Sequence, residues 1–203
     1  LEPGAHPSAS ALRALLRAGE TEQALSLLPA AIARVYQEEA AAGRAPVWGE
    51  ICQRAVLARL RTMTESDFAA LDQGREGLCR RLYHASRTAA SVEELLSAAK
   101  TRRYAYARLR RMVLWAYLGL TPADVPEKVP YLRPLAANDT GCRLLSAMRK
   151  QSAAPVLTKP ADVRTLGPEA RRLLSLEARA TDLYTLAYPA LSAAAGGTEG
   201  RVL

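Results

Sequence analysis

Apolar residues recur three and four positions apart along most of the chain, and glycines, prolines and short polar clusters separate the runs. This spacing is typical of helices that bury one face. Gly19 and Gly43 each follow such a run and are expected to end it. The first 120 residues therefore predict helices over 11–18, 21–28, 30–42, 48–61, a short one from Thr64, 76–89 and 92–100, and the helical pattern continues from there through 103–118.

A capping box precedes one of these helices. Ser91 is followed three residues later by Glu94. In such a box the serine oxygen and the glutamate carboxylate each accept a hydrogen bond from a backbone N–H that the first helical turn leaves unpaired. We expect the helix to begin at Val92.

The pattern changes after Leu120. Three prolines fall within residues 121–130, which predicts a loop. Residues 131–136 and 155–158 are then expected to form strands, with a helix over 139–150 between them. A crossover of that length can pair two strands in parallel. A last helix is predicted over 168–188, followed by a disordered tail.

The composition supports a mainly helical fold. Of 203 residues, 40 are alanine, 31 are leucine and one is phenylalanine, which favours helices and disfavours a β-sandwich or barrel. The predicted fold is a multi-helix domain with a small C-terminal β-α-β unit.

Membrane insertion and extracellular disulfides are not expected. The longest apolar run, over 112–120, is about half of the roughly 18 residues that a spanning helix needs. The three cysteines are far apart, and no signal peptide precedes the first helix. We predict a cytoplasmic protein. The first residue is leucine, which suggests that the chain begins inside a larger protein.

Positive charge is concentrated in one segment. The chain has 28 basic and 20 acidic residues, and its net charge is +8. Residues 80–111 hold nine basic and two acidic side chains, which gives 9 − 2 = +7. A compositional bias of the genome towards arginine would scatter these residues, so their clustering favours an anionic partner.

The predicted helix through residues 100–118 separates apolar from cationic side chains. Counted at 100° per residue, the side opposite the apolar stripe holds Tyr104 and Trp115, while Arg102 falls towards the apolar side. Such a face can follow phosphates while an aromatic ring stacks on an exposed base. The cations on that side are Lys100, Arg103, Arg108, Arg110 and Arg111.

Other interpretations of the cationic face remain open. Its arginines can pair with acids elsewhere in the chain, dock an acidic protein or domain, or lie on a membrane surface. The last is weaker, because the opposite face has the composition of an ordinary core.

Several segments resemble one known family. They read Arg-Glu-Gly-Leu-Cys-Arg-Arg-Leu at 75–82, Ser-Val-Glu-Glu-Leu-Leu at 91–96, Lys-Thr-Arg-Arg-Tyr-Ala-Tyr-Ala-Arg-Leu-Arg-Arg at 100–111, Tyr-Leu-Arg-Pro-Leu at 131–135, Pro-Val-Leu-Thr-Lys at 155–159 and Arg-Ala-Thr-Asp-Leu-Tyr at 179–184. Together they resemble the C-terminal half of the bacterial tRNA(Met) cytidine acetate ligases, which are similar to nucleotidyltransferases with a His-x-Gly-His signature.

The resemblance implies a function in tRNA modification. Members of that family use ATP to make acetyl-adenylate and transfer the acetyl group to N4 of the wobble cytidine of elongator tRNA(Met). The two histidines here, His6 and His84, stand in no such signature. The chain is therefore expected to be the tRNA-binding portion, inactive alone, with ATP bound only together with an N-terminal catalytic domain.

The resemblance also implies a domain plan. Residues 1–28 would be the end of the nucleotidyltransferase-like domain, 29–120 a helical RNA-binding domain, 121–190 a small αβ or helical unit and 191–203 a disordered tail. The residues expected to bind tRNA are Lys100, Arg102, Arg103, Tyr104, Arg108 and Arg111.

A Ser-rich segment resembles the motif that closes the family's nucleotide site. Ser8, Ser10 and Arg13 would supply half of an ATP site, because free amides at a helix N-terminus and an arginine one turn later bind phosphate. Ser8 is equally well explained as an ordinary N-cap. No residue is assigned to catalysis or to a metal. Cys79 stands where relatives are expected to have asparagine, and it is interpreted as a packed thiol.

Overall fold

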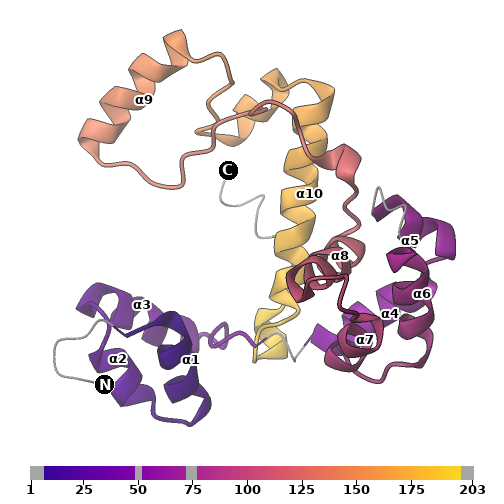
Figure 1. Cartoon of the computed structure of the whole chain (residues 1–203). Helices are drawn as coiled ribbons and strands as arrows, with labels where there is room; N and C mark the ends of the chain where they lie inside the picture. Colours follow the sequence, from indigo (N-terminus) through magenta and orange to yellow (C-terminus); the bar gives the residue numbers. More distant parts are fainter. Residues whose placement is uncertain (1–6, 49–51, 72–76, 198–203) are drawn as a thin grey trace. The chain divides into compact units, whose positions relative to one another are not determined.

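The computed structural model describes residues 7–48, 52–71 and 77–197, and within them the protein is mainly helical (Figure 1). Two compact units are formed, one from residues 1–51 with 185–195 and one from residues 52–184 with 196–203. The α-helices are α1 Ala9–Arg17, α2 Thr21–Ser26, α3 Ala30–Ala41, α4 Gln53–Thr62, α5 Glu65–Leu71, α6 Leu78–Thr88, α7 Val92–Ala99, α8 Tyr106–Leu118, α9 Asp139–Gln151 and α10 Pro168–Thr185. Three 3-10 turns are described: η2 Pro122–Asp124, η3 Pro160–Thr165 and η4 Leu191–Ala193.

The first unit contains α1, α2 and α3, as the apolar spacing predicted. Gly43 follows α3 with a positive φ of 72°. Its carbonyl accepts a hydrogen bond of 3.0 Å from the backbone N–H of Ala190. A Cβ at this position would lie 2.3 Å from the Cβ of Ala190, so both the conformation and the close approach require glycine.

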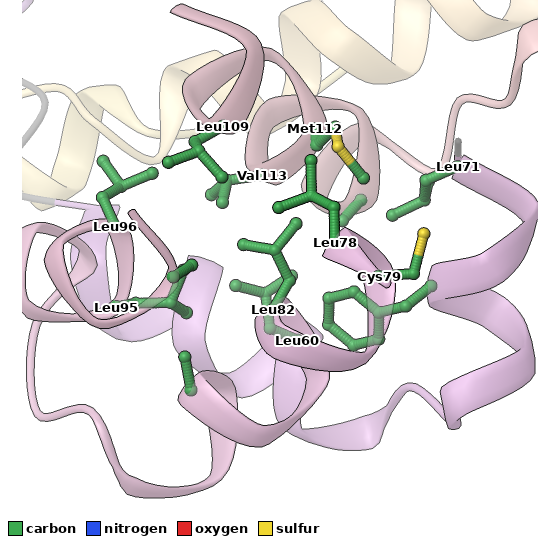
Figure 2. Packing of buried hydrophobic residues seen from close by; sticks show 14 of the residues in the cluster. Leu60, Leu71, Leu78, Cys79, Leu82, Leu95, Leu96, Leu109, Met112 and Val113 are labelled. Carbon is green, nitrogen blue, oxygen red and sulfur yellow. The ribbon is translucent and has the colours of Figure 1, made fainter. Parts of the chain in front are cut away.

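The second unit is built around one hydrophobic cluster from α4, α5, α6, α7 and α8 (Figure 2). The side chains of Leu60, Leu95 and Leu109 are completely buried there. Cys79 also lies in this cluster, as expected of a packed thiol. The cluster fixes α6, α7 and α8 relative to one another, and these three helices carry the basic segment.

Two arginines join the ends of α4 and α6. Arg61 donates to the carbonyl oxygens of Ser86, at 3.3 Å, and Ala89, at 2.8 Å. Arg87 donates in return to the carbonyl oxygens of Arg61 and Met63. Carbonyls at a helix C-terminus lack partners within the helix, and a cation there is also favoured by the helix dipole. Part of the sequence's positive charge therefore stabilises the fold.

The capping box at α7 is confirmed for its serine. The Oγ of Ser91 accepts a hydrogen bond of 3.0 Å from the N–H of Glu94. The carboxylate of Glu94 accepts from the N–H of Ala90, at 2.9 Å, one residue before the expected donor. The helix begins at Val92, as predicted.

The prediction of a β-α-β unit was wrong. In the part of the chain that the structure describes, residues 131–136 and 155–158 meet only in an isolated parallel bridge between Leu132 and Val156. In this bridge the N–H of Leu132 donates to the carbonyl of Pro155, and the N–H of Leu157 donates to the carbonyl of Leu132, each at 2.8 Å. Pro134 and Pro155 have no N–H to donate, so the pairing cannot extend into a ladder.

A second hydrophobic cluster takes the place of the predicted sheet. It packs Tyr131, Leu157 and Leu166 against the first half of α10. The helix α9 begins at Asp139, as predicted, with Asn138 as its N-cap, and none of its residues is buried. This region is therefore held by loop residues that contact one helix.

Several other boundaries also differ from the prediction. The helix predicted from residue 103 begins at Tyr106, and α10 ends at Thr185 rather than at 188. The turn η4 lies within the segment predicted to be disordered, and residues 198–203 lie outside the described residues. Within residues 7–48, 52–71 and 77–197, no helix is long and apolar enough to cross a membrane.

Asp124 connects η2 to α10. Its carboxylate accepts a hydrogen bond of 2.7 Å from Arg172 and bonds of 2.9 Å from the backbone N–H and hydroxyl of Thr121. Burial raises the pKa of this carboxyl, but the hydrogen bonds from Thr121 and Arg172 lower it by more, so the pKa lies below its ordinary value. Because the pKa is lower in the folded state, Asp124 stabilises the fold above about pH 4, and this contribution is lost as the pH falls through the lowered pKa.

We expect Asp124→Asn to lower the free energy of unfolding by about 1 kcal/mol at pH 7, since the hydrogen bonds to a charged group are lost while the exposed Arg172 limits the effect. The difference from the unaltered protein should shrink below pH 4, measured by urea denaturation at pH 7 and pH 3. Glu127→Gln, in the exposed loop that follows, is the control. An equal loss for Asp124→Asn at both pH values would contradict the assignment.

Candidate functional site

A turn between α7 and α8 presents the cationic side chains. The helix α7 ends at Ala99, and α8 begins after Ala105, whose backbone is extended. Between them the N–H of Tyr104 donates to the carbonyl of Thr101, at 3.4 Å, and the N–H of Arg103 donates to the Thr101 hydroxyl, at 3.3 Å. The basic segment is therefore a turn followed by a helix, and not one continuous helix.

Tyr104 anchors this turn in the core. Only 3% of its surface is exposed, and it belongs to the hydrophobic cluster of the second unit. The expectation that its ring lies on the cationic face was wrong, because the helical phase counted from Lys100 does not apply across the turn. Arg102 and Arg103, which precede the anchor, are both exposed.

Two arginines of α8 lie over aromatic rings. The guanidinium of Arg108 is 5.8 Å from the centre of the Tyr104 ring, and that of Arg110 is 5.1 Å from the Tyr106 ring. Such cation–π contacts hold a guanidinium in place without neutralising its charge. The hydroxyl of Tyr106 donates to Glu93 at 2.6 Å, so this ring is itself fixed.

Basic side chains of the turn and of α8 form a cationic strip, the name used here for Lys100, Arg102, Arg103, Arg108 and Arg111. Within residues 7–48, 52–71 and 77–197, no carboxylate pairs with Arg102, Arg103 or Arg111. Lys100 donates to the carbonyl of Thr101 at 2.5 Å, which satisfies one of its donors and leaves its charge. The interpretation that these cations are neutralised by acids of the same chain is therefore not supported for the three arginines.

Three acids of the described residues in this region have other partners. Glu65 lies 3.6 Å from Arg80, an exposed residue of α6 outside the strip. Glu93 accepts from Tyr106, and Glu94 accepts from the backbone of Ala90. None of these three carboxylates neutralises Arg102, Arg103 or Arg111.

The predicted nucleotide half-site lies at the start of α1. Ser8 is the N-cap, and its Oγ accepts a hydrogen bond of 3.2 Å from the N–H of Ala11. Ser10 and Arg13 are exposed on the first turns of the helix. A phosphate group accepts hydrogen bonds from donors of this kind at a helix N-terminus.

Sequence reasoning missed the turn and the role of Thr101 in it. One signal was present, since a helix running through Lys100 would have placed Arg102 towards the apolar side. A charged side chain in the core is costly, and such a misfit indicates a break in the helix.

In the described residues no group of three or more His, Cys, Asp and Glu side chains is placed to hold a metal ion.

A family model of known proteins matches nearly the whole chain. It is that of the HIGH nucleotidyl transferases, and it covers residues 2–199. Among curated relatives, the chain is 34% identical over 167 residues to the tRNA(Met) cytidine acetate ligase of Acetivibrio thermocellus, which covers 79% of this chain and 40% of that protein. It is 28% identical over 208 residues to that of Fervidobacterium nodosum, covering 92% of this chain and 49% of the relative.

The fold is also that of a solved structure. A crystal structure of Thermotoga maritima TmcAL bound with alpha-thio ATP superposes with a TM-score of 0.88 at 24% sequence identity. The match covers 97% of this chain and 51% of the other. The chain therefore spans about half the length of the relatives it matches.

Proposed function

The chain belongs to the HIGH nucleotidyl transferase family. From this membership, and because Arg102, Arg103 and Arg111 of the strip have no carboxylate partner among the described residues, we propose that the chain is the tRNA-binding portion of a tRNA(Met) cytidine acetate ligase. The relatives bearing that name support the assignment of the reaction. In this proposal the complete protein activates acetate with ATP and transfers the acetyl group to N4 of the wobble cytidine of elongator tRNA(Met).

The strip supplies the binding of the tRNA backbone. Arginine presents a planar fork of donors that suits phosphate oxygens, and most contacts between proteins and nucleic acids are made to phosphate and sugar. Arg103 and Arg111 offer guanidiniums that no carboxylate of the described residues neutralises. This observation carries the proposal, because a strip already paired within the molecule would have little to gain from RNA.

Tyr104 does not stack on a base in this proposal, because its ring is buried. Its buried ring lies under Arg108 and positions that guanidinium for a phosphate. The exposed side chains of Arg102 and Arg103 would then contact the RNA directly.

The half-site at α1 is part of the same proposal. The donors of Ser8, Ser10 and Arg13 would hold one phosphate of ATP, and the remaining contacts to the nucleotide would come from a catalytic domain with the His-x-Gly-His signature. ATP supplies the activation of acetate. The residues of this chain only bind and orient a phosphate there.

The salt dependence of tRNA binding tests the strip. The logarithm of affinity falls with the logarithm of salt concentration by about 0.7–0.9 for each phosphate neutralised. We expect Arg103→Ala with Arg111→Ala to reduce that slope by between one and two units in titrations of a tRNA(Met) transcript. Arg34→Ala with Arg164→Ala removes two exposed arginines elsewhere and is the matched control.

Competition with heparin separates the proposal from docking of an acidic protein. A tRNA-binding strip should prefer folded tRNA over heparin at equal charge concentration. Equal slopes in the two double variants, or displacement of tRNA by heparin without any preference, would contradict the proposed function.

A further inference from the structure

A surface hollow lies beside the strip, lined by Arg81, Thr101, Arg102, Arg103 and Tyr104. Arg81 comes from α6, and the other residues come from the turn between α7 and α8. The side chains that line the hollow therefore come from segments about 20 residues apart, which the core of the second unit holds in place.

Arg81 is held in position by two hydrogen bonds. Its Nε donates to the carbonyl of Ala99, at 3.3 Å, and its Nη2 donates to the carbonyl of Ala98, at 3.2 Å. These carbonyls lie at the C-terminal end of α7, so Arg81 also caps that helix. The N–H groups on Nη1 have no protein partner among the described residues. A guanidinium already fixed in this way loses little conformational entropy when it binds a ligand.

Thr101 adds a neutral donor. Its Oγ1 accepts the N–H of Arg103, which fixes the position of the oxygen. A hydroxyl that accepts one hydrogen bond still has its own proton to donate. Thr101 can therefore donate to an anion without disturbing the turn.

The remaining lining residues favour an anion as well. Arg102 and Arg103 have no carboxylate partner within the described residues, and Tyr104, the fifth lining residue, is buried. Three arginines and a threonine line the hollow beside this tyrosine, and no carboxylate is among the lining residues. A phosphate group, with oxygens pointing in several directions, matches such a set of forked donors better than a planar carboxylate does.

We propose that this hollow binds a single phosphate group through Arg81, Thr101, Arg102 and Arg103. The inference deepens the proposed function, since a phosphodiester of the bound tRNA is the source that the adjoining strip favours. Inorganic or nucleotide phosphate shares the same chemistry, and the experiment below distinguishes these sources.

Nuclear magnetic resonance of the whole chain tests the site directly. The Nε–Hε signals of Arg81 and Arg103 should shift and saturate when inorganic phosphate is added at constant ionic strength. Those of Arg34, which is exposed and pairs with Glu38, should not. Signals of Arg81 that move no more than those of Arg34 would overturn the proposal.

Thr101→Val removes the hydroxyl and keeps the shape of the side chain. We expect it to weaken phosphate binding roughly tenfold, because a hydrogen bond to a charged ligand is lost, and Thr101→Ser should restore binding. Arg80→Ala removes one charge from the neighbouring position of α6 outside the hollow and should weaken binding less than Thr101→Val does. A titration of Thr101→Val equal to that of the unaltered chain would contradict the site.

The same spectra separate the site from the proposed function. If tRNA displaces phosphate from the hollow, the occupant is an RNA phosphodiester. If phosphate saturates the hollow while the chain binds no tRNA, the site stands and the proposed function fails. If tRNA binds and moves the Arg103 signal while the Arg81 signal stays unmoved, the proposed function stands and the site fails.

Discussion

Phe68→Ala should lower the free energy of unfolding by about 3–5 kcal/mol, the usual cost of removing a fully buried aromatic side chain. Phe68 is 1% exposed and is the single phenylalanine of the chain. Its ring meets that of Tyr83 edge to face, with centroids 6.0 Å apart. The loss thus combines hydrophobic transfer, a cavity and an aromatic pair worth about 1 kcal/mol. Guanidinium denaturation followed by far-ultraviolet circular dichroism measures it.

The control for this change is an apolar residue on the surface. Leu114 lies on α8 and is 53% exposed, so Leu114→Ala should change the free energy of unfolding by less than about 0.5 kcal/mol. A loss below about 1 kcal/mol for Phe68→Ala would contradict the packing in which α5 closes the core against α6. Because α6 also carries Arg81, this packing supports the cationic surface.

Local patterns in the sequence were enough to predict most of the helices. Apolar spacing located α1, α2, α3, α6 and α7. Gly19 and Gly43 lie two residues after α1 and α3, and Ser91 lies directly before α7. Ser91 works as an N-cap through bonds within three residues. Such signals depend on neighbours in the chain, so no knowledge of the tertiary structure is needed.

The absent strands show where local patterns fail. Residues 131–136 and 155–158 have the composition of strands, but a ladder needs a donor on every second residue of both partners. Pro134 and Pro155 remove donors at the bridge, and packing against α10 satisfies the apolar side chains instead. The length of the crossover allows two parallel strands, but the prolines leave the strands without the N–H donors that a ladder needs. Giving the missing donors more weight than the crossover length would have predicted loops for both segments.

The candidate site was predicted in composition but not in geometry. Clustering of charge identified the segment that holds the strip, and the structure leaves Arg102, Arg103 and Arg111 without carboxylate partners in its described part. The turn at Thr101 could not be derived from helix propensities, because lysine, arginine and tyrosine are all tolerated in helices. Arg81 is distant in sequence and reaches the hollow only through the packing of α6 against α7.

Reversing two charges of the strip should abolish most tRNA binding. For Arg103→Glu with Arg111→Glu we expect an affinity loss of about 100-fold or more at physiological salt, since two phosphate contacts are lost and two carboxylates repel the backbone. Fluorescence anisotropy with a labelled tRNA(Met) transcript measures the loss. Both side chains are exposed, so the thermal unfolding midpoint should stay close to that of the unaltered chain.

A second double variant shows whether arrangement or total charge is responsible. Arg34→Glu with Arg164→Glu also lowers the net charge by four, from +8 to +4, at exposed positions outside the strip. Binding that depends on net charge alone would fall equally in the two variants. If tRNA binds through the strip, its affinity falls far more for Arg103→Glu with Arg111→Glu than for the variant outside the strip. The reason is that the Debye length in physiological salt is about 8 Å, so each charge acts only on nearby groups. Equal losses would therefore reject the strip as the tRNA-binding surface.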